Sequence, residues 1–251
     1  MNGFDVQTSN EGLISIDDLG SEGSGATRDF SSAYSPAYFE HSEAAVDSWR
    51  YSYVKRALDF VAASSMLVML AIPGLFIAAA IIATSSGPVF YRERRIGRYG
   101  RTFEIWKFRT MHQKAPRLQK KHGSEAAGDH ISYRTRKTQH DPRITGVGGF
   151  LRRWSLDEVP QIFNVLRGEM SMIGPRPIVE AEASFYNELL PFYLAATPGL
   201  SGLWQVSGRS NIDYPKRAAL DASYVMDWSL WTDFEIFVQT IPAVLKKTGA
   251  C

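Results

Sequence analysis

Two adjacent carboxylates, Asp157 and Glu158, are followed two residues later by Pro160. A helix tolerates proline in its first turn, so we expect a helix that begins at about 155–158 and carries both carboxylates at its N-terminus. Free backbone N–H groups and the positive end of the helix dipole favour an ionised carboxylate there, and they also favour a bound phosphate. An ionised Asp157 can attack phosphorus to give an aspartyl-phosphate type of intermediate, while Glu158 can hold Mg²⁺.

The same spacing has a purely structural interpretation, because Ser155-x-x-Glu158 matches a capping box. The positive charge around the two carboxylates favours a catalytic role for them instead. Guanidinium groups suited to bidentate phosphate contact lie nearby in the sequence, at Arg143, Arg152, Arg153, Arg167, Arg176 and Arg209. Residues 92–121 add eleven Lys and Arg against two Glu, with Lys107 and Arg109 among them. For any single arginine, a solvated surface charge is the alternative.

Other chemical signatures do not occur in the sequence. The glycine-rich stretch at 146–151 ends in Leu151 where a dinucleotide-binding motif needs glycine, and no Gly-Lys-Ser/Thr phosphate loop is present. The five histidines lack the spacing of metal ligands. The single cysteine, Cys251, excludes an intrachain disulfide and a cysteine-based zinc site.

Charge divides the chain of 251 residues into two parts. The net charge is −7 over residues 1–50 and +9 over residues 51–251, although the whole chain carries only +2. Residues 1–48 are rich in Ser, Gly, Asp and Glu, which predicts a disordered acidic tail. The basic remainder predicts an anionic partner, either nucleic acid, an anionic membrane surface or a phosphorylated substrate.

A long apolar run follows the tail. Residues 60–91 contain no charged side chain, and the 24 positions 60–83 are almost wholly apolar. As one straight helix they would extend about 36 Å, enough to cross a hydrocarbon core of roughly 30 Å. However, Pro73 interrupts the run, and both flanks are basic, with Lys55 and Arg56 before it and five arginines soon after it. A kinked span and a re-entrant helix that bends at Pro73 are therefore both open.

The remaining elements are mixed. Short strands are predicted at 89–91 and 103–106, on either side of a turn at 97–100. Helix-like apolar spacing occurs at 157–167, 178–194, 214–227 and 230–247. The last two stretches carry aromatic and apolar residues that fit either a membrane interface or the core: Tyr224, Trp228, Trp231, Phe234, Phe237 and Ile241. We expect an α+β fold that is mostly helical.

Several blocks between residues 53 and 247 resemble the bacterial sugar transferases, which are monotopic phosphoglycosyl transferases. The blocks that carry the resemblance occur in the family's order and spacing. They are Lys55-Arg56-x-x-Asp59, Gly87-Pro88-Val89-Phe90-Tyr91, Arg94-Arg95-Ile96-Gly97, Lys107-Phe108-Arg109-Thr110-Met111, Asp141-Pro142-Arg143, Ser155-Leu156-Asp157-Glu158-Val159-Pro160-Gln161, Gly174-Pro175-Arg176-Pro177, the run from Pro198 to Arg209, and Asp227-Trp228-Ser229-Leu230-Trp231.

The resemblance implies a monotopic protein of the bacterial inner membrane. Residues 49–88 would form a re-entrant membrane helix broken at Pro73, and 89–251 a cytoplasmic catalytic domain with interfacial amphipathic helices. The chain departs from the family at one position, because Ile72 precedes Pro73 where serine is common.

The resemblance also implies the reaction. Hexose 1-phosphate would pass from a UDP-hexose, with galactose or glucose as the sugar, to undecaprenyl phosphate, as the first membrane step of exopolysaccharide synthesis. In this family the residue that matches Asp157 attacks the sugar-bearing phosphate and expels UMP, and Glu158 matches the partner that binds Mg²⁺ with it. Arg152, Arg176 and Arg209 match residues that hold the nucleotide and phosphates, with Lys107 and Arg109 as further substrate-binding candidates. Downstream glycosyltransferases would use the product.

Two other classes of function fit some of these features less well than a sugar transferase does. A membrane-tethered regulator could bind nucleic acid through the basic residues, but it leaves Asp157 and Glu158 without a role, and no nucleic-acid recognition module is present. We therefore expect no nucleic-acid partner. An aspartyl-phosphate hydrolase usually carries an Asp-x-Asp motif, whereas position 159 here is Val159.

Overall fold

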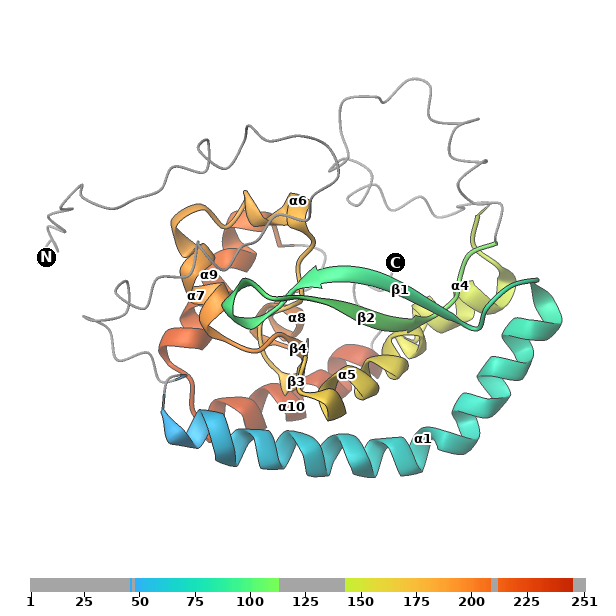
Figure 1. The fold of residues 1–251 in the computed structure, drawn as a ribbon, viewed down its shortest axis with the longest axis horizontal. Coiled ribbons are helices and arrows are strands. Elements are labelled where there is room, and N and C mark those ends of the chain that lie inside the picture. Colours follow the sequence, from blue (N-terminus) through green and yellow to red (C-terminus); the bar gives the residue numbers. More distant parts are fainter. Residues whose placement is uncertain (1–45, 47, 113–142, 209–211, 246–251) are drawn as a thin grey trace, which may run out of the picture.

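A computed structural model describes residue 46 and residues 48–112, 143–208 and 212–245, and Figure 1 shows their arrangement. Nearly all of the predicted acidic tail, 1–48, lies outside the described residues, as do Asp141, Pro142 and Arg209. The prediction of a mostly helical fold with some sheet is confirmed. The elements are α1 (Arg56–Thr84), β1 (Phe90–Ile96), β2 (Thr102–Phe108), α4 (Gly146–Arg153), α5 (Ile162–Arg167), β3 (Ser171–Ile173), α6 (Glu180–Ala183), α7 (Leu190–Ala195), β4 (Gly199–Ser201), α8 (Leu203–Ser207), α9 (Tyr214–Met226) and α10 (Leu230–Leu245).

An antiparallel hairpin of β1 and β2 crosses the middle of the molecule (Figure 1). It contains the predicted strands and turn, and it pairs Phe90 with Phe108 and Ile96 with Thr102 at its two ends. The turn at Arg98–Gly100 places Tyr99 at φ 59° and Gly100 at φ 74°, in the left-handed region. The hairpin extends further than the apolar residues predicted, because the four consecutive charged residues of β1, at 92–95, also pair with β2.

A second sheet pairs β3 with β4 in parallel, through Ser171 with Gly199 and Ile173 with Ser201. Backbones approach closely beside it, since a Cβ on Gly199 would lie 2.1 Å from the backbone nitrogen of Gly174. Only glycine fits at such a contact. This packing brings the loop that follows β3 against the start of β4.

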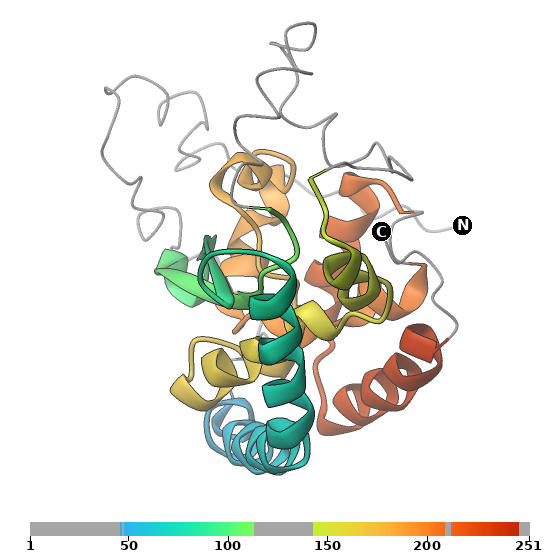
Figure 2. The same ribbon diagram turned by 90° about the vertical axis from the view of Figure 1, so that its right-hand side faces the viewer.

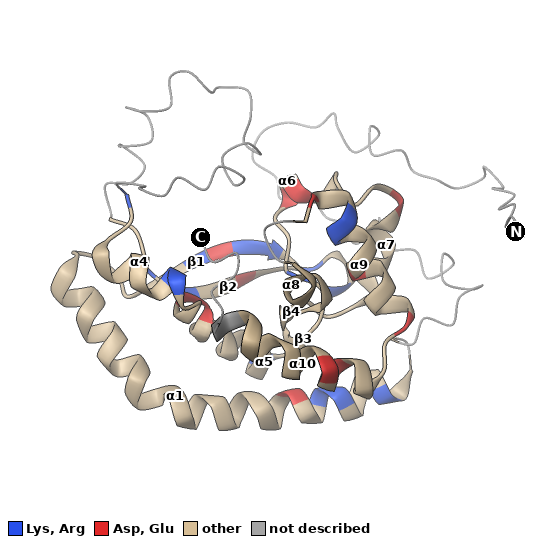
Figure 3. Ribbon diagram, turned by 180° about the vertical axis from the view of Figure 1, so that it is seen from behind, with Lys and Arg blue, Asp and Glu red and all other residues tan. Residues whose placement is uncertain are grey.

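The apolar run forms one long helix, α1, which is preceded by a π-helical turn at Arg50–Lys55. Within the described residues, it belongs to the one helix long and apolar enough to cross a membrane. Its large apolar side chains are exposed, among them Val68 (80%), Ile72 (68%) and Phe76 (73%). Beyond its first turns it carries no charged residue (Figure 3). Such a surface needs an apolar environment.

The helix is not divided into two separate arms. It is continuous through Pro73, and Figure 1 shows that it changes direction within its length. Proline cannot donate a helix hydrogen bond and its ring crowds the preceding turn, so a bend is the expected response.

Buried charges fix the first turns of α1 to the rest of the protein. Lys55 Nζ lies 2.7 Å from Asp233 Oδ2 on α10 and 3.6 Å from Asp59 Oδ1. Asp59 also accepts hydrogen bonds from Ser171 Oγ at 2.7 Å and from the Met172 backbone N–H at 3.0 Å, both on β3. The Lys55-Arg56-x-x-Asp59 block therefore joins three elements.

Helix α10 lies on the same side of the molecule as α1 in two views (Figures 1 and 2). The sequence left open whether the aromatic and apolar residues between 224 and 241 belong to the core or to a membrane interface, and the structure divides them. Tyr224 and Trp228, just before α10, are buried in the core. The side chains on the outer side of α10 are exposed: Trp231, Phe234, Phe237 and Ile241.

We predict that Asp59→Ala destabilises the folded protein by about 3 kcal/mol, because a buried lysine then loses one of its two carboxylates and two donors lose their acceptor. The matched control is Glu104→Ala, which removes a half-exposed ion pair with Arg92 at 3.4 Å. It should cost less than about 1 kcal/mol. Denaturant titration of detergent-purified protein measures both, and equal losses would contradict the buried role of Asp59.

Candidate functional site

The predicted carboxylates lie in a 3₁₀ turn, Leu156–Gln161, that follows α4. The expected helix start at about 155–158 is confirmed, with both carboxylates in the first turn, but this turn is 3₁₀ and the α-helix follows it from Ile162. Pro160 sits inside the 3₁₀ turn, where its missing N–H costs least. Within the described chain Ser155 does not cap this turn with its side chain; it takes a left-handed φ of 55° instead. The capping-box alternative is therefore not realised.

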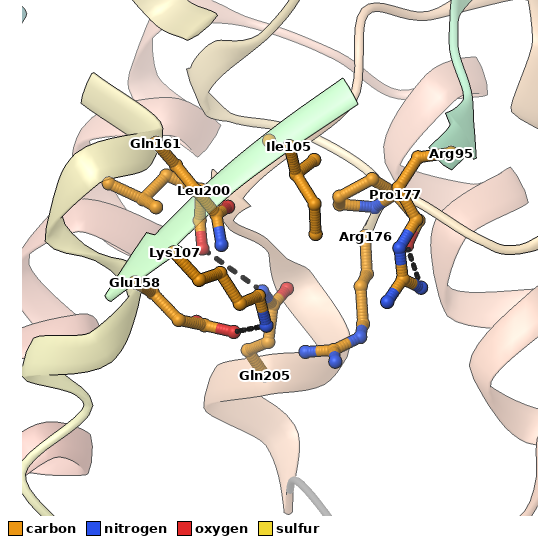
Figure 4. A pocket seen from close by; sticks show the side chains of 10 residues that line it. Arg95, Ile105, Lys107, Glu158, Gln161, Arg176, Pro177, Leu200 and Gln205 are labelled. Atoms are coloured by element: carbon orange, nitrogen blue, oxygen red, sulfur yellow. Dashed lines mark hydrogen bonds and ion pairs between the residues drawn. The ribbon is translucent and has the colours of Figure 1, made fainter. Parts of the chain in front are cut away.

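Glu158 is held by a lysine from the hairpin. Lys107 Nζ, on β2, donates to Glu158 Oε1 at 2.7 Å, and both side chains are largely buried (Figure 4). Both are predicted site residues, but nothing in the sequence pairs them. The pair keeps one carboxylate of the dyad ionised.

A small cavity adjoins this pair, and Figure 4 shows the ends of Lys107, Arg176 and Gln205 converging on it. Its enclosed volume is about 10 Å³, which is the size of one water molecule, so a larger ligand would lie against its mouth. The side chains that line it include Arg95, Ile105, Lys107, Glu158, Gln161, Arg176 and Gln205.

The two adjacent carboxyl groups have opposite pKa shifts. Burial opposes the ionisation of Glu158, but Lys107 and Arg176 outweigh it and lower the pKa of Glu158 to about 2. Burial and the neighbouring Glu158 raise the pKa of Asp157, against the opposing charges of Lys107 and Arg152. Carboxyl groups whose environments drive their pKa values apart commonly take different chemical roles. Asp157 is thus the member of the dyad that is not committed to a lysine.

Arg152 reaches the site from α4. Its Nε donates to Thr110 Oγ1 at 2.9 Å, just beyond the end of β2. The helix can approach this closely because of Gly148, where an added Cβ would lie 2.1 Å from the Thr110 carbonyl oxygen. The glycine-rich stretch that sequence analysis rejected as a nucleotide motif therefore has a packing role, which orients Arg152.

Arg176 and Arg109 have different surroundings. The Arg176 guanidinium lies against the mouth of the cavity and 5.6 Å from the ring centroid of Trp204. Arg109 is buried and donates to Ser85 at the C-terminal end of α1, at 2.7 Å to its carbonyl and 2.8 Å to its hydroxyl. The structure thus brings Asp157, Glu158, Lys107, Arg152 and Arg176 together and places Arg109 at the end of the apolar helix.

Sequence reasoning missed two polar residues of the site. Arg95 is buried, donates to the Pro177 carbonyl at 3.1 Å and forms an ion pair with Glu93. Gln205 donates to the Leu200 carbonyl at 3.2 Å. Both residues lie in blocks that the family resemblance covered, but nothing in their spacing indicated that they face the cavity.

The donor set is compatible with Mg²⁺ in one particular way. In the part of the chain that the structure describes, no group of three or more His, Cys, Asp or Glu side chains could enclose a metal ion. Two carboxylates, Asp157 and Glu158, are available. Mg²⁺ commonly binds to one or two carboxylates together with substrate phosphates and water, so this pair fits a metal that arrives with a diphosphate.

We predict that Gly148→Ala destabilises the protein by about 2 kcal/mol, because the new methyl group would push α4 away from Thr110. Gly149→Ala is the matched control, since its Cβ would meet nothing closer than 3.9 Å. That variant should be neutral or more stable by up to about 1 kcal/mol, as for a glycine in a helix interior. Thermal denaturation of the two variants tests this, and a loss in Gly149→Ala as large as in Gly148→Ala would contradict the close contact.

Comparison with known proteins identifies the family of the chain. The family model "Bacterial sugar transferase" matches residues 50–247. The chain is 45% identical over 197 residues to the exopolysaccharide production protein ExoY of Rhizobium meliloti, covering 78% of this chain and 87% of that protein. It is 42% identical over 202 residues to the undecaprenyl-phosphate galactose phosphotransferase of Salmonella typhimurium, covering 79% of this chain and 42% of that protein.

A third relative is the UDP-glucose:undecaprenyl-phosphate glucose-1-phosphate transferase of Caulobacter vibrioides. It is 39% identical over 204 residues, which cover 78% of this chain and 71% of that protein. The family model covers the chain from the turn before α1 to the end of α10. It therefore includes the apolar helix as well as the carboxylate dyad. The chain belongs to the bacterial sugar transferase family and is an enzyme of that class.

Proposed function

We propose that this protein transfers hexose 1-phosphate from a UDP-hexose to undecaprenyl phosphate and releases UMP, as the first membrane step of exopolysaccharide synthesis. The observation that carries the proposal is the carboxylate dyad, in which Lys107 holds Glu158 at 2.7 Å while Asp157 keeps a raised pKa beside it. The printed names of the relatives, which act on undecaprenyl phosphate with galactose or glucose, support this substrate class.

Asp157 is the nucleophile in this proposal. A carboxylate oxygen of Asp157 forms a bond to the phosphorus that carries the sugar, and the bond from that phosphorus to the UMP oxygen breaks, so that UMP leaves with the electron pair. A phosphate oxygen of the polyprenyl acceptor then attacks the same phosphorus and the bond to Asp157 breaks. Undecaprenyl diphosphate sugar forms, and the free carboxylate returns.

The basic residues stabilise charge during both displacements. Phosphoryl transfer depends mainly on positioning and on neutralising charge on the phosphate oxygens. Arg176 lies at the cavity mouth, and Arg152 is close enough to lower the pKa of Asp157. Lys107 keeps Glu158 ionised. Arg209 lies outside the described residues, and its part in holding phosphate rests on the family resemblance.

The carboxylates of Glu158 and Asp157 would hold Mg²⁺, with the donor's phosphate oxygens and water as the other ligands. The metal would supply charge neutralisation at the diphosphate. Arg176 and Arg152 would bind the donor's phosphates beside the dyad.

The membrane setting follows from α1 and the acceptor. A polyprenyl phosphate presents its charge at the level of the lipid headgroups, and a UDP-sugar is a water-soluble donor. We propose that α1 enters the bacterial inner membrane from the cytoplasmic face and returns at the bend associated with Pro73, with the α10 aromatic residues at the interface. The carboxylate dyad then faces the cytoplasm at headgroup level.

We predict a burst of UMP release without lipid acceptor, approaching one UMP per enzyme. Asp157→Asn should lower the rate of UMP release on the order of 10³-fold, so that no burst is seen, because an amide is not a nucleophile. Asp213→Asn is the matched control, since Asp213 is an exposed cap of α9, where Asn caps equally well. Parallel reactions with UDP-galactose and UDP-glucose identify the sugar.

Two results of that experiment would count against the mechanism. Continuous UMP release without acceptor would mean that water is the acceptor and that the protein is a hydrolase. Formation of lipid-linked product with no burst would mean direct transfer between the two substrates, and Asp157 would then have another role.

We predict that Lys107→Met moves the acid limb of the pH profile of kcat/KM upward by roughly one pH unit, because the lysine lowers the pKa of both carboxyl groups. Without it, Asp157 and Glu158 remain protonated to higher pH, and the ionised nucleophile is lost sooner as the pH falls. Lys107→Arg keeps the charge and should keep the limb near its original position. If the limb does not move in Lys107→Met, Lys107 does not control the ionisation of the dyad.

A further inference from the structure

A second and much larger cavity, of about 450 Å³, lies apart from the catalytic one. Its walls are the first turns of α1, the tip of the β1–β2 hairpin and the connection from α5 to β3. No residue lines both cavities, and neither Asp157 nor Glu158 lines this one. The proposed transfer reaction therefore leaves it without a role.

The cavity is cationic. Three of its guanidinium groups, those of Arg56, Arg101 and Arg167, form no ion pair with any carboxylate in the described part of the chain. Arg56 donates to the Leu166 carbonyl at 2.9 Å, and Arg167 lies 5.3 Å from the Trp106 ring centroid. Neither contact neutralises charge, and Arg101 is exposed. Three positive charges around one space repel one another until an anion enters.

The two acidic residues that line the cavity offset only part of this charge, because five cationic side chains line it: Lys55, Arg56, Arg98, Arg101 and Arg167. Asp59 accepts from Ser171 and Met172 and lies beside Lys55, whose ammonium is also held by Asp233. Glu169 accepts from Asn164 Nδ2 at 2.7 Å. Asp59 is thus paired with Lys55, and the single charge of Glu169 leaves the cavity with an excess of positive charge.

The position of the cavity indicates the kind of anion. Arg56 and Asp59 line it and belong to the first turn of α1. The exposed apolar surface of the helix begins at the same place, with Leu58, Phe60 and Val61 more than half exposed. A cavity at the polar end of an apolar helix opens where lipid headgroups lie, and guanidinium groups bind phosphate oxygens in pairs.

We propose that this cavity binds the phosphate headgroup of an anionic phospholipid of the bilayer, through Arg56, Arg101 and Arg167. The bound headgroup would hold the hairpin tip and the α5–β3 connection at a fixed depth beside the start of α1. This inference concerns lipid binding and does not depend on the transfer reaction.

The test is calorimetric titration of the detergent-purified full chain with short-chain phosphatidylglycerol. Saturable binding is expected to wild type, and zwitterionic phosphatidylcholine of the same chain length should bind at least tenfold more weakly. Arg101→Gln combined with Arg167→Gln should weaken phosphatidylglycerol binding on the order of tenfold. The corresponding lysine substitutions should recover part of the affinity, because they keep the charge but lose the paired geometry.

The control is Arg94→Gln, an exposed arginine of the same hairpin that lines neither cavity. Its affinity for phosphatidylglycerol should equal that of wild type. Arg101→Gln alone serves if the double variant has a lowered Tm, since the Arg101 side chain is exposed. Equal affinity in wild type and the cavity variants, an equal loss in Arg94→Gln, or tighter binding of a short polyprenyl phosphate than of phosphatidylglycerol would each overturn the proposal.

Discussion

The ammonium group of Lys55 is buried between Asp233 at 2.7 Å and Asp59 at 3.6 Å, and three separate parts of the chain meet there. Asp59 belongs to the apolar helix and reaches β3, while Asp233 belongs to α10. A buried lysine without a carboxylate is costly, so the helix cannot detach from the domain without exposing these charges. The network therefore determines where the apolar surface of α1 begins relative to β3, whose parallel partner β4 lines the cavity beside Glu158.

At Asp157 and Glu158, charge is arranged in a different way. Two carboxylates adjacent in sequence are given different partners, because Lys107 comes from β2 and takes only Glu158. Arg176 adds to the stabilisation of the ionised Glu158, whereas burial acts on Asp157 with less compensation. A short 3₁₀ turn suffices to hold both residues, because the hairpin and α4 supply the surrounding positive charges.

Local sequence signals predicted what depends on local residues. The hairpin followed from apolar strands on either side of a glycine turn, and α1 followed from its uncharged run. The dyad was found because two carboxylates stand together beside a proline. The helix start was predicted at the right place, but its 3₁₀ geometry was not, because the proline rule does not distinguish a 3₁₀ turn from a first α-turn.

Contacts between residues that are far apart in the sequence could not be predicted. Asp59 binds Ser171, which is 112 positions away, and no pattern in either segment indicates the other. The three-residue strands β3 and β4 are too short to give an alternating signal. Arg109 was expected at the substrate, and its place at the end of α1 depends on how that helix packs against Phe108. The family resemblance added roles for residues but not these contacts.

In the proposed mechanism Asp157, and not Glu158, carries the phosphosugar. The most direct measurement is tandem mass spectrometry of proteolytic peptides from enzyme that has been treated with UDP-galactose or UDP-glucose and quenched before lipid is added. We expect a hexose-phosphate mass on Asp157. The same mass on Glu158, or unmodified peptide from enzyme that still makes lipid-linked product, would contradict it.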